Sequence, residues 1–212
     1  PALDGDSDAP HVQRDRRKRW EMAVQNQMRD TLVGSGFIEV VTHSFVHPNQ
    51  NGIIEPTRPS VLLDNPLSPD LSAMRTSLAA SMLSVVQWNS NRKVYNLRIF
   101  EMGRVFWAKP EGLPDEPVHL CLMMTGQRAN PHWDVKSEQL DFFDIKGIAE
   151  VVLNRFALDK VDTEPYDGAG TLFNTNQSAV FLADQIPIGV CGAVSQRVLV
   201  YYTIREPVWM CQ

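Results

Sequence analysis

The chain has 212 residues, 43% of them apolar, which is enough to bury one large domain or two small ones. A net charge of −5 argues against wholesale electrostatic binding of nucleic acid, because phosphate neutralisation needs clustered Lys and Arg. The sequence has neither an apolar run of about 18 residues nor a signal peptide pattern, so we expect no membrane partner and a cytoplasmic location.

The three cysteines, Cys121, Cys191 and Cys211, form no C-x-x-C pair. An odd number with long gaps indicates neither a disulfide framework nor a zinc site. We therefore expect three buried, reduced thiols and no bound metal.

Residues 1–13 carry prolines, a glycine and aspartates with little to bury, and they predict a linker remnant that precedes one domain over 14–212. A helix is predicted from Arg14 to Val33, ended by Gly34 and Gly36. Its apolar residues recur every four positions, at Trp20, Val24, Met28 and Leu32. By periodicity alone this stripe is a core face.

The next segment, 37–48, is rich in Val, Ile and Phe and predicts one strand that closes at Pro48. A second helix is predicted to begin at Ser68, because Ser68-Pro69-Asp70 offers an N-cap, a proline at the first helical position and an acidic residue after it. The apolar stripe of this helix is Met74, Leu78, Met82, Val85 and Val86.

Residues 97–108 and 118–126 predict an antiparallel pair of strands around a proline-rich connection. A third helix is predicted over 141–158, followed by two strands within 178–195 that turn at Asp184-Gln185, and the end of the chain, 208–212, also resembles a strand. Because strands and helices do not alternate regularly, we favour an α+β fold with a largely antiparallel sheet.

Nucleotide-binding glycine loops, zinc-protease helices and the esterase elbow are not present as motifs in the sequence. His43 and His47 are four residues apart on the predicted strand, a separation of about 13 Å that cannot share one ion. Asp141 and Asp144 could act as paired carboxylates, but their place at a helix start favours capping.

One basic run stands out, at the predicted start of the first helix: Arg14, Arg16, Arg17, Lys18 and Arg19. Positive charge is unfavourable there, so an acidic neighbour could offset it. A solvated helix start, a phosphate backbone and an acidic partner subunit remain alternatives.

Residues 64–106 carry four matches in order: Asn65-Pro66-Leu67-Ser68, Met74-Arg75-Thr76-Ser77-Leu78, Asn89 with Arg92, and Phe100-Glu101-Met102-Gly103-Arg104-Val105-Phe106. This pattern resembles the phenylalanyl-tRNA synthetase beta chain family, and the resemblance covers about nine tenths of the chain. Residues 172–179 depart from the usual F-H-P-G-R-S-A, so we assign no role to that loop.

The resemblance implies a class II aminoacyl-tRNA synthetase-like antiparallel sheet flanked by helices. It also implies that the first helix and following strand form a subunit interface, with Trp20, Val24, Met28 and Leu32 as candidates. The partners implied are an alpha subunit and a second beta subunit in an (αβ)2 enzyme. That whole enzyme uses ATP and magnesium to charge tRNA with phenylalanine, and we expect no cofactor in this chain.

Active class II synthetases carry F-R-x-E in their second motif, where the arginine binds the α-phosphate of ATP. Here Phe106 is followed by Trp107, and Lys109 stands where the carboxylate is expected. The glycine-rich third motif of active synthetases is matched only weakly, by the residues that lead to Arg197. We therefore expect a non-catalytic scaffold, with Arg75, Glu101, Arg104 and Trp107 as remnants of a pocket.

Two alternatives remain open. In an independent class II amino-acid-activating enzyme, Arg75, Glu101 and Arg104 would line a working pocket, and pyrophosphate exchange would depend on Arg75. In a tRNA-contacting module, the run from Arg14 to Arg19 would bind RNA with an affinity that falls steeply with salt.

Overall fold

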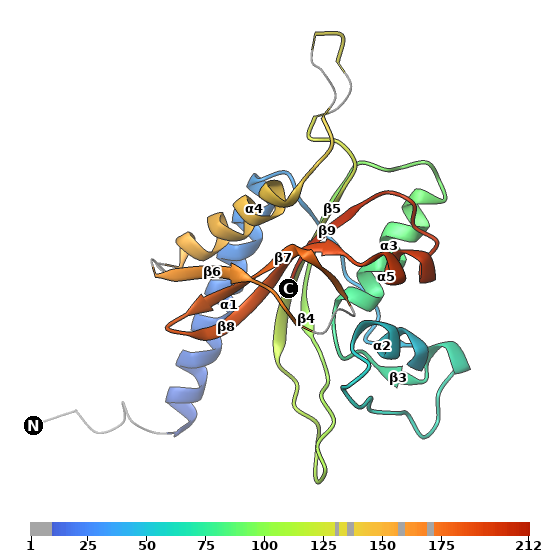
Figure 1. The fold of residues 1–212 in the computed structure, drawn as a ribbon. Helices are drawn as coiled ribbons and strands as arrows, with labels where there is room; N and C mark the ends of the chain where they lie inside the picture. The colour runs from blue at the N-terminus through green and yellow to red at the C-terminus, as the bar shows by residue number, and fades with distance from the viewer. Residues whose placement is uncertain (1–9, 130–131, 135–137, 157–159, 169–171) are drawn as a thin grey trace, which may run out of the picture.

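The computed structural model describes residues 10–129, 132–134, 138–156, 160–168 and 172–212, so most of the predicted linker lies outside the described residues (Figure 1). The helices are α1 (Pro10–Gly34), α2 (Pro48–Ile54), α3 (Ala79–Ser90), α4 (Phe142–Arg155) and α5 (Gln196–Tyr201), with a 3-10 turn η1 (Pro69–Leu71). The strands are β1 (Ile38–Glu39), β2 (Phe45–Val46), β3 (Ala73–Met74), β4 (Leu97–Arg104), β5 (Val118–Thr125), β6 (Val161–Pro165), β7 (Phe173–Ala183), β8 (Ile186–Val194) and β9 (Val208–Cys211).

A seven-stranded sheet with the order β1-β4-β5-β9-β8-β7-β6 forms the centre of the molecule (Figure 1). All of its neighbours are antiparallel except β1 and β4. The short strand β9 joins the β4–β5 hairpin to the β7–β8 hairpin, although it comes last in the chain. The predicted α+β class with a largely antiparallel sheet is therefore confirmed.

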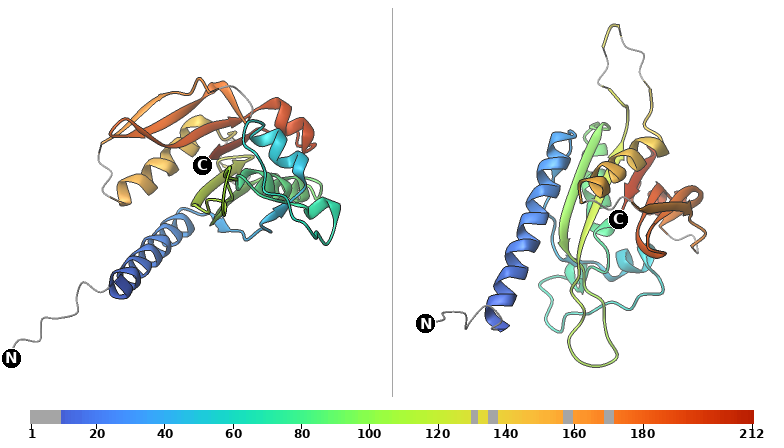
Figure 2. Two further views of the ribbon diagram at one scale, coloured as in Figure 1. Left: turned by 90° about the horizontal axis from the view of Figure 1, so that it is seen from below. Right: turned by 90° about the vertical axis from the view of Figure 1, so that its left-hand side faces the viewer.

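Helices cover both faces of this sheet (Figure 2). On one face, α1 and α4 contribute Leu32 and Ile145 to a core with Phe100 of β4. On the other face, α2, α3 and α5 pack against the alternate residues of the same strands, for example Met82 on Ile99. The alternation follows from the period of two along a strand, which sends successive side chains to opposite faces.

Helix α1 begins at Pro10, four positions before the predicted Arg14, so residues 10–13 belong to the helix and not to a linker. It ends as predicted: Gly36 has φ +84°, its N–H donates to Val33, and the N–H of Phe37 donates to Leu32. This pattern is a Schellman motif, in which glycine supplies the left-handed residue. The motif turns the chain so that Phe37 packs beside Leu32 in the core.

Two predicted elements are wrong in extent. The single strand over 37–48 divides into β1 and β2, and His47 is not on a strand but caps α2, where its Nδ1 accepts from the N–H of Asn49. Ser68 caps only the turn η1, because the following residues leave the helical path to pair β3 with β2. The second helix therefore begins at Ala79, and Met74 lies outside it.

The remaining predicted elements are present with shifted ends: β4 ends at Arg104 and not at 108, α4 ends at Arg155 with 157–158 outside the described residues, and β7 begins at Phe173. Strand β6 was not predicted. The β4–β5 hairpin pairs from Leu97 opposite Thr125 to Arg104 opposite Val118. Asp184 and Gln185 both have positive φ, as a tight turn between β7 and β8 requires. In the described part of the chain, no helix is both long and apolar enough to cross a membrane.

Candidate functional site

A buried ion pair ties together the segments that carry the synthetase-like motifs. Nη1 of Arg75 lies 2.7 Å from Oε1 of Glu101, and the two side chains are 4% and 3% exposed. The Nε of Arg75 also donates to the carbonyl of Arg104 at 2.9 Å. Thr42 completes the cluster, because its hydroxyl donates to Glu101 at 2.7 Å and accepts from Arg75. The Nε and Nη1 groups of Arg75, the carboxylate of Glu101 and the hydroxyl of Thr42 thus have protein partners.

Gly103 makes room for this arrangement. A Cβ atom at this position would lie 2.3 Å from Nη2 of Arg75 and 3.3 Å from Leu78. Packing thus requires glycine at position 103 of the F-E-x-G segment, since a larger side chain there would displace the guanidinium of Arg75.

We predict that Gly103→Ala lowers the free energy of unfolding by about 1–3 kcal/mol, the usual cost of overpacking a filled core. Urea denaturation followed by circular dichroism measures this. Gly52→Ala in α2, where a Cβ meets nothing within 4 Å, is the matched control and should be neutral or stabilising. If Gly103→Ala costs as much without the Arg75 side chain as with it, the clash is not its cause.

Trp107 directly follows the F-E-x-G-x-V-F segment. Its indole N–H donates to the carbonyl of Thr76 at 3.0 Å, and its ring lies under the guanidinium of Arg58, 4.2 Å from ring centroid to Cζ. The edge of His119 packs against the same ring, with centroids 5.3 Å apart. The indole is thus held by a hydrogen bond, a cation–π contact and an aromatic contact.

Two cavities of about 620 and 610 Å³ meet beside Trp107. Both are bordered by Glu55, Arg58, Val190 and Gln212. We call this surface the central groove. Its walls are mainly apolar, and the salt bridge from Arg58 to Glu55, 3.2 Å long, places one charge of each sign at its rim. Such a paired guanidinium is a weaker phosphate ligand than a free one.

A chain of neutral hydrogen bonds crosses the floor of the central groove. The hydroxyl of Ser77 lies 2.8 Å from Oε1 of Gln212, and Nε2 of Gln212 lies 3.3 Å from Nδ1 of His119. Burial lowers the pKa of His119, and the charge of Arg58 lowers it further. The imidazole is therefore neutral near pH 7 and adds no positive charge for an anion.

The four residues predicted as a pocket remnant do not converge on one cavity. Trp107 borders the central groove, whereas Arg75 and Glu101 are closed against each other. Arg104 points outward, 59% exposed, toward Glu116. Lys109 pairs with Asp115 in the same connection, and Arg197 donates to the carbonyl of Ile53.

Among the described residues, no group of three or more His, Cys, Asp and Glu side chains is placed to hold a metal ion. Glu55 is the carboxylate at the rim of the central groove, and it is paired with Arg58. Magnesium with ATP requires carboxylates together with cationic groups for the phosphates. The residues that line the central groove therefore do not fit a site for magnesium with ATP.

The apolar stripe on α1 is buried at its C-terminal end and exposed at its N-terminal end. Leu32 is fully buried and Met28 packs against the same core, whereas Trp20 is 67% exposed. Figure 2 shows why: the N-terminal half of α1 extends beyond the sheet. The core interpretation therefore applies to the C-terminal half, whereas the projecting half exposes Trp20 and leaves Val24 half-buried.

The basic run lies on this projecting half of α1. Arg16, Arg17, Lys18 and Arg19 are exposed, and Arg17 pairs with Glu21 at 2.9 Å; the side chain of Arg14 lies outside the described residues. Because the helix begins at Pro10, the run is more than one turn inside it. The predicted dipole penalty is therefore weaker than expected, since it falls off within the first turn.

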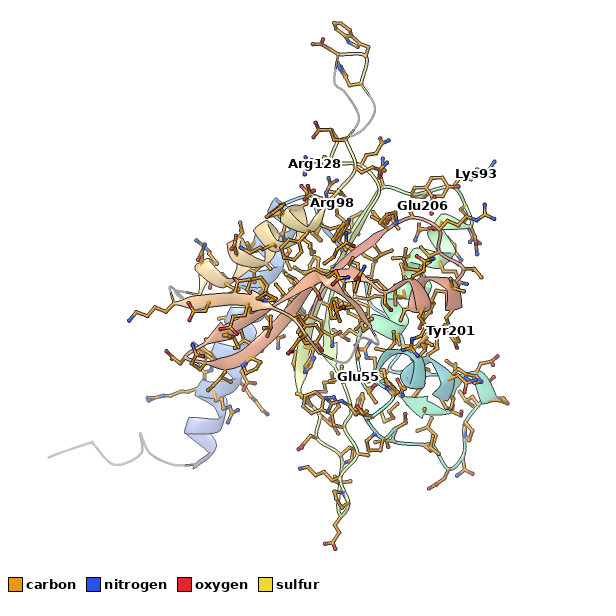
Figure 3. All side chains as sticks on the ribbon, viewed as in Figure 1. Glu55, Lys93, Arg98, Arg128, Tyr201 and Glu206 are labelled. Carbon is orange, nitrogen blue, oxygen red and sulfur yellow. The ribbon has the colours of Figure 1, made fainter. Side chains whose placement is uncertain are left out.

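Asp141 and Asp144 have the capping role that their position predicts. Asp141 accepts from the N–H groups of Phe143 and Asp144, and Asp144 accepts from the N–H of Asp141. Burial works to raise the pKa of Asp141, but these N–H groups and Arg128 outweigh it, so the pKa is lowered. Arg128 also contacts Glu138, and it fixes the start of the helix (Figure 3).

The sheet between two helical layers, with a long first helix and a β4–β5 hairpin, defines the class II aminoacyl-tRNA synthetase fold. The solved structure of PylSc, a pyrrolysyl tRNA synthetase from Desulfitobacterium hafniense, matches it with a TM-score of 0.67 at 15% identity, over 90% of this chain and 64% of that one. At this identity the likeness shows the fold alone.

Residues 7–212 match the sequence model of the phenylalanyl tRNA synthetase beta chain CLM domain, and the chain belongs to this family. The phenylalanine–tRNA ligase beta subunit of Syntrophus aciditrophicus is 35% identical over 194 residues, which are 89% of this chain and 24% of that protein. The same subunit of Vibrio cholerae is 36% identical over 174 residues, 79% of this chain and 21% of that protein. The chain thus spans about a quarter or less of the length of these relatives.

Proposed function

We propose that the chain is the non-catalytic, class II-like core of a phenylalanine–tRNA ligase beta subunit, and that it holds the (αβ)2 enzyme together. One observation carries the proposal most strongly. Glu101 and Arg75, from two of the family-like segments, are held in a closed ion pair, and Trp107, where the arginine of an active second motif is expected, is held by Thr76 and Arg58. A guanidinium that is already paired cannot stabilise the charge of a developing adenylate.

The partners under this proposal are an alpha subunit, which would perform the ATP- and magnesium-dependent reaction, and a second beta subunit. The exposed half of α1 offers a suitable contact, because Trp20 and Met22 are 67% and 63% exposed. Aromatic residues of this kind often dominate interface energetics. The adjacent basic run would face acidic groups on the partner, and the assembly would work in the cytoplasm.

We predict that the chain forms a complex with a phenylalanine–tRNA ligase alpha subunit in analytical ultracentrifugation, and that Trp20→Asp weakens it by about 30-fold or more, the loss typical of a central aromatic. Trp133→Asp is the matched control, since Trp133 is 90% exposed and lies outside α1. Equal binding by both variants would exclude α1 as the contact. No complex with the unmodified chain, where a full-length beta subunit binds, would contradict the scaffold role.

A second, smaller role is direct contact with tRNA through the basic run. The exposure of Arg16 to Arg19 on a projecting helix supports it. Binding by neutralised phosphates would weaken linearly in log salt, and replacing two of these residues by Gln would reduce the slope by about 2. A salt-independent gel shift, or none, would remove this role without affecting the scaffold proposal.

A further inference from the structure

Two of the three cysteines face each other across neighbouring strands. Cys191 of β8 is directly opposite Cys211 of β9. The adjacent residues Val190 and Gln212 exchange two backbone hydrogen bonds, of 2.8 and 3.0 Å. In an antiparallel ladder the next pair is then a non-hydrogen-bonded one, with Cα atoms about 4.5 Å apart and both side chains on the same face. The two thiols therefore form a cross-strand dithiol.

The third cysteine, Cys121, serves as an internal control for this pair. Cys211 is opposite Leu122 of β5, so the side chain of Cys121, one residue away, points to the other face of the sheet. Cys121 packs in the core with α3, whereas Cys191 packs on Ala149 and Phe181. All three are free thiols.

The dithiol is approached from the Cys211 side alone, because Cys191 is fully buried and does not line the cavity, and both thiols are slow toward ordinary oxidants. Cys211 is partly exposed and borders the 610 Å³ cavity, beside Phe181 and Val152. Burial raises the pKa of Cys191 to about 11 and also raises that of Cys211. Both groups are neutral thiols near pH 7, which makes them slow in disulfide exchange.

We propose that Cys191 and Cys211 form a binding site for a thiophilic centre with two open positions, of the class of the monosubstituted trivalent arsenicals. In the reaction R–As=O + 2 Cys–SH → R–As(S–Cys)2 + H2O, two As–S bonds form and the arsenic–oxygen bond breaks. Both thiol protons leave with the oxygen as water, and no atom changes oxidation state. An aryl substituent R would occupy the apolar cavity.

Redox chemistry distinguishes a bridging atom from a direct S–S bond at this pair. The side chains of a non-hydrogen-bonded pair are close enough for either link. An arsenic atom bridges the two sulfurs without an oxidant, whereas a disulfide requires one. The adduct would link β8 to β9, the strand that joins the two halves of the sheet.

The test uses the full 212-residue chain, phenylarsine oxide as the probe, and excess glutathione as a competing monothiol. Native mass spectrometry should show one arsenical per chain, removed by dithiothreitol. Cys191→Ala and Cys211→Ala should each lower the affinity by about 100-fold or more, because they abolish two-point attachment. Cys121→Ala should bind as the unmodified chain does.

Circular dichroism in parallel confirms that each protein is folded, and Cys121→Val replaces Cys121→Ala if the latter is not. The proposal is overturned if the folded chain takes up no arsenical, if uptake requires denaturant, if Cys191→Ala or Cys211→Ala retains it, or if a folded Cys121 variant loses it.

Discussion

Replacing Arg75 with Ala is expected to lower the free energy of unfolding by about 3–5 kcal/mol. The change leaves Glu101, 2% exposed, as a buried charge without its countercharge. The carbonyl of Arg104 and the hydroxyl of Thr42 would lose their donor as well. Guanidinium chloride denaturation monitored by circular dichroism measures the effect, because one cooperative transition yields the free energy directly.

Two comparisons make this result specific. Arg104→Ala removes an exposed arginine whose partner Glu116 is 3.8 Å away, so it should cost less than about 1 kcal/mol. The double variant Arg75→Met with Glu101→Leu removes both charges and should recover much of the loss. A cost below about 1 kcal/mol for Arg75→Ala would mean that water reaches Glu101, and the closed site inferred here would then be open.

The outcome bears on function as well as stability. In the alternative of an independent amino-acid-activating enzyme, Arg75 would contact substrate, and its loss would reduce activity with a small change in stability. In the scaffold proposal, its loss destabilises the domain and changes no intrinsic chemistry. Stability and pyrophosphate exchange measured on the same variant therefore separate the two.

The parts of the fold that the sequence predicts are those with local causes. Gly36 ends α1 because a left-handed residue is needed there, and Asp141 begins α4 because its carboxylate binds free N–H groups. The turn at Asp184 and Gln185 is equally local. Each signal acts within a few residues, so neighbouring sequence is sufficient to read it.

The failures have non-local causes. Ser68-Pro69-Asp70 is a sound helix start, yet pairing of β3 with β2 limits it to one turn. In the site, sequence reasoning missed Arg58 and Gln212, which reach Trp107 and His119 only through the tertiary fold. Arg58 carries no motif, and a loop arginine near a tryptophan cannot be recognised from spacing.

Gly192 provides the second large expected effect. An alanine Cβ there would lie 2.4 Å from the Cβ of Ser178 and 2.5 Å from the carbonyl oxygen of Gln177. These contacts involve the backbone of β7 next to a register shift in its pairing with β8, so no flexible side chain can move aside. We expect Gly192→Ala to lower the free energy of unfolding by about 3 kcal/mol or more, the upper range for overpacking.

The matched control lies on the same strand. Gly189→Ala would place its Cβ 3.4 Å from the carbonyl oxygen of Gln212, an ordinary contact, and should change stability by less than about 1 kcal/mol. Gly192 is also opposite Met210 of β9, the strand that leads into Gln212 and the central groove. Separation of β7 from β8 should thus disturb the groove, and loss of near-ultraviolet tryptophan ellipticity before global unfolding, absent when Trp107 is replaced by Phe, would reveal it. If Gly189→Ala and Gly192→Ala cost the same, close backbone approach is not what requires glycine at position 192.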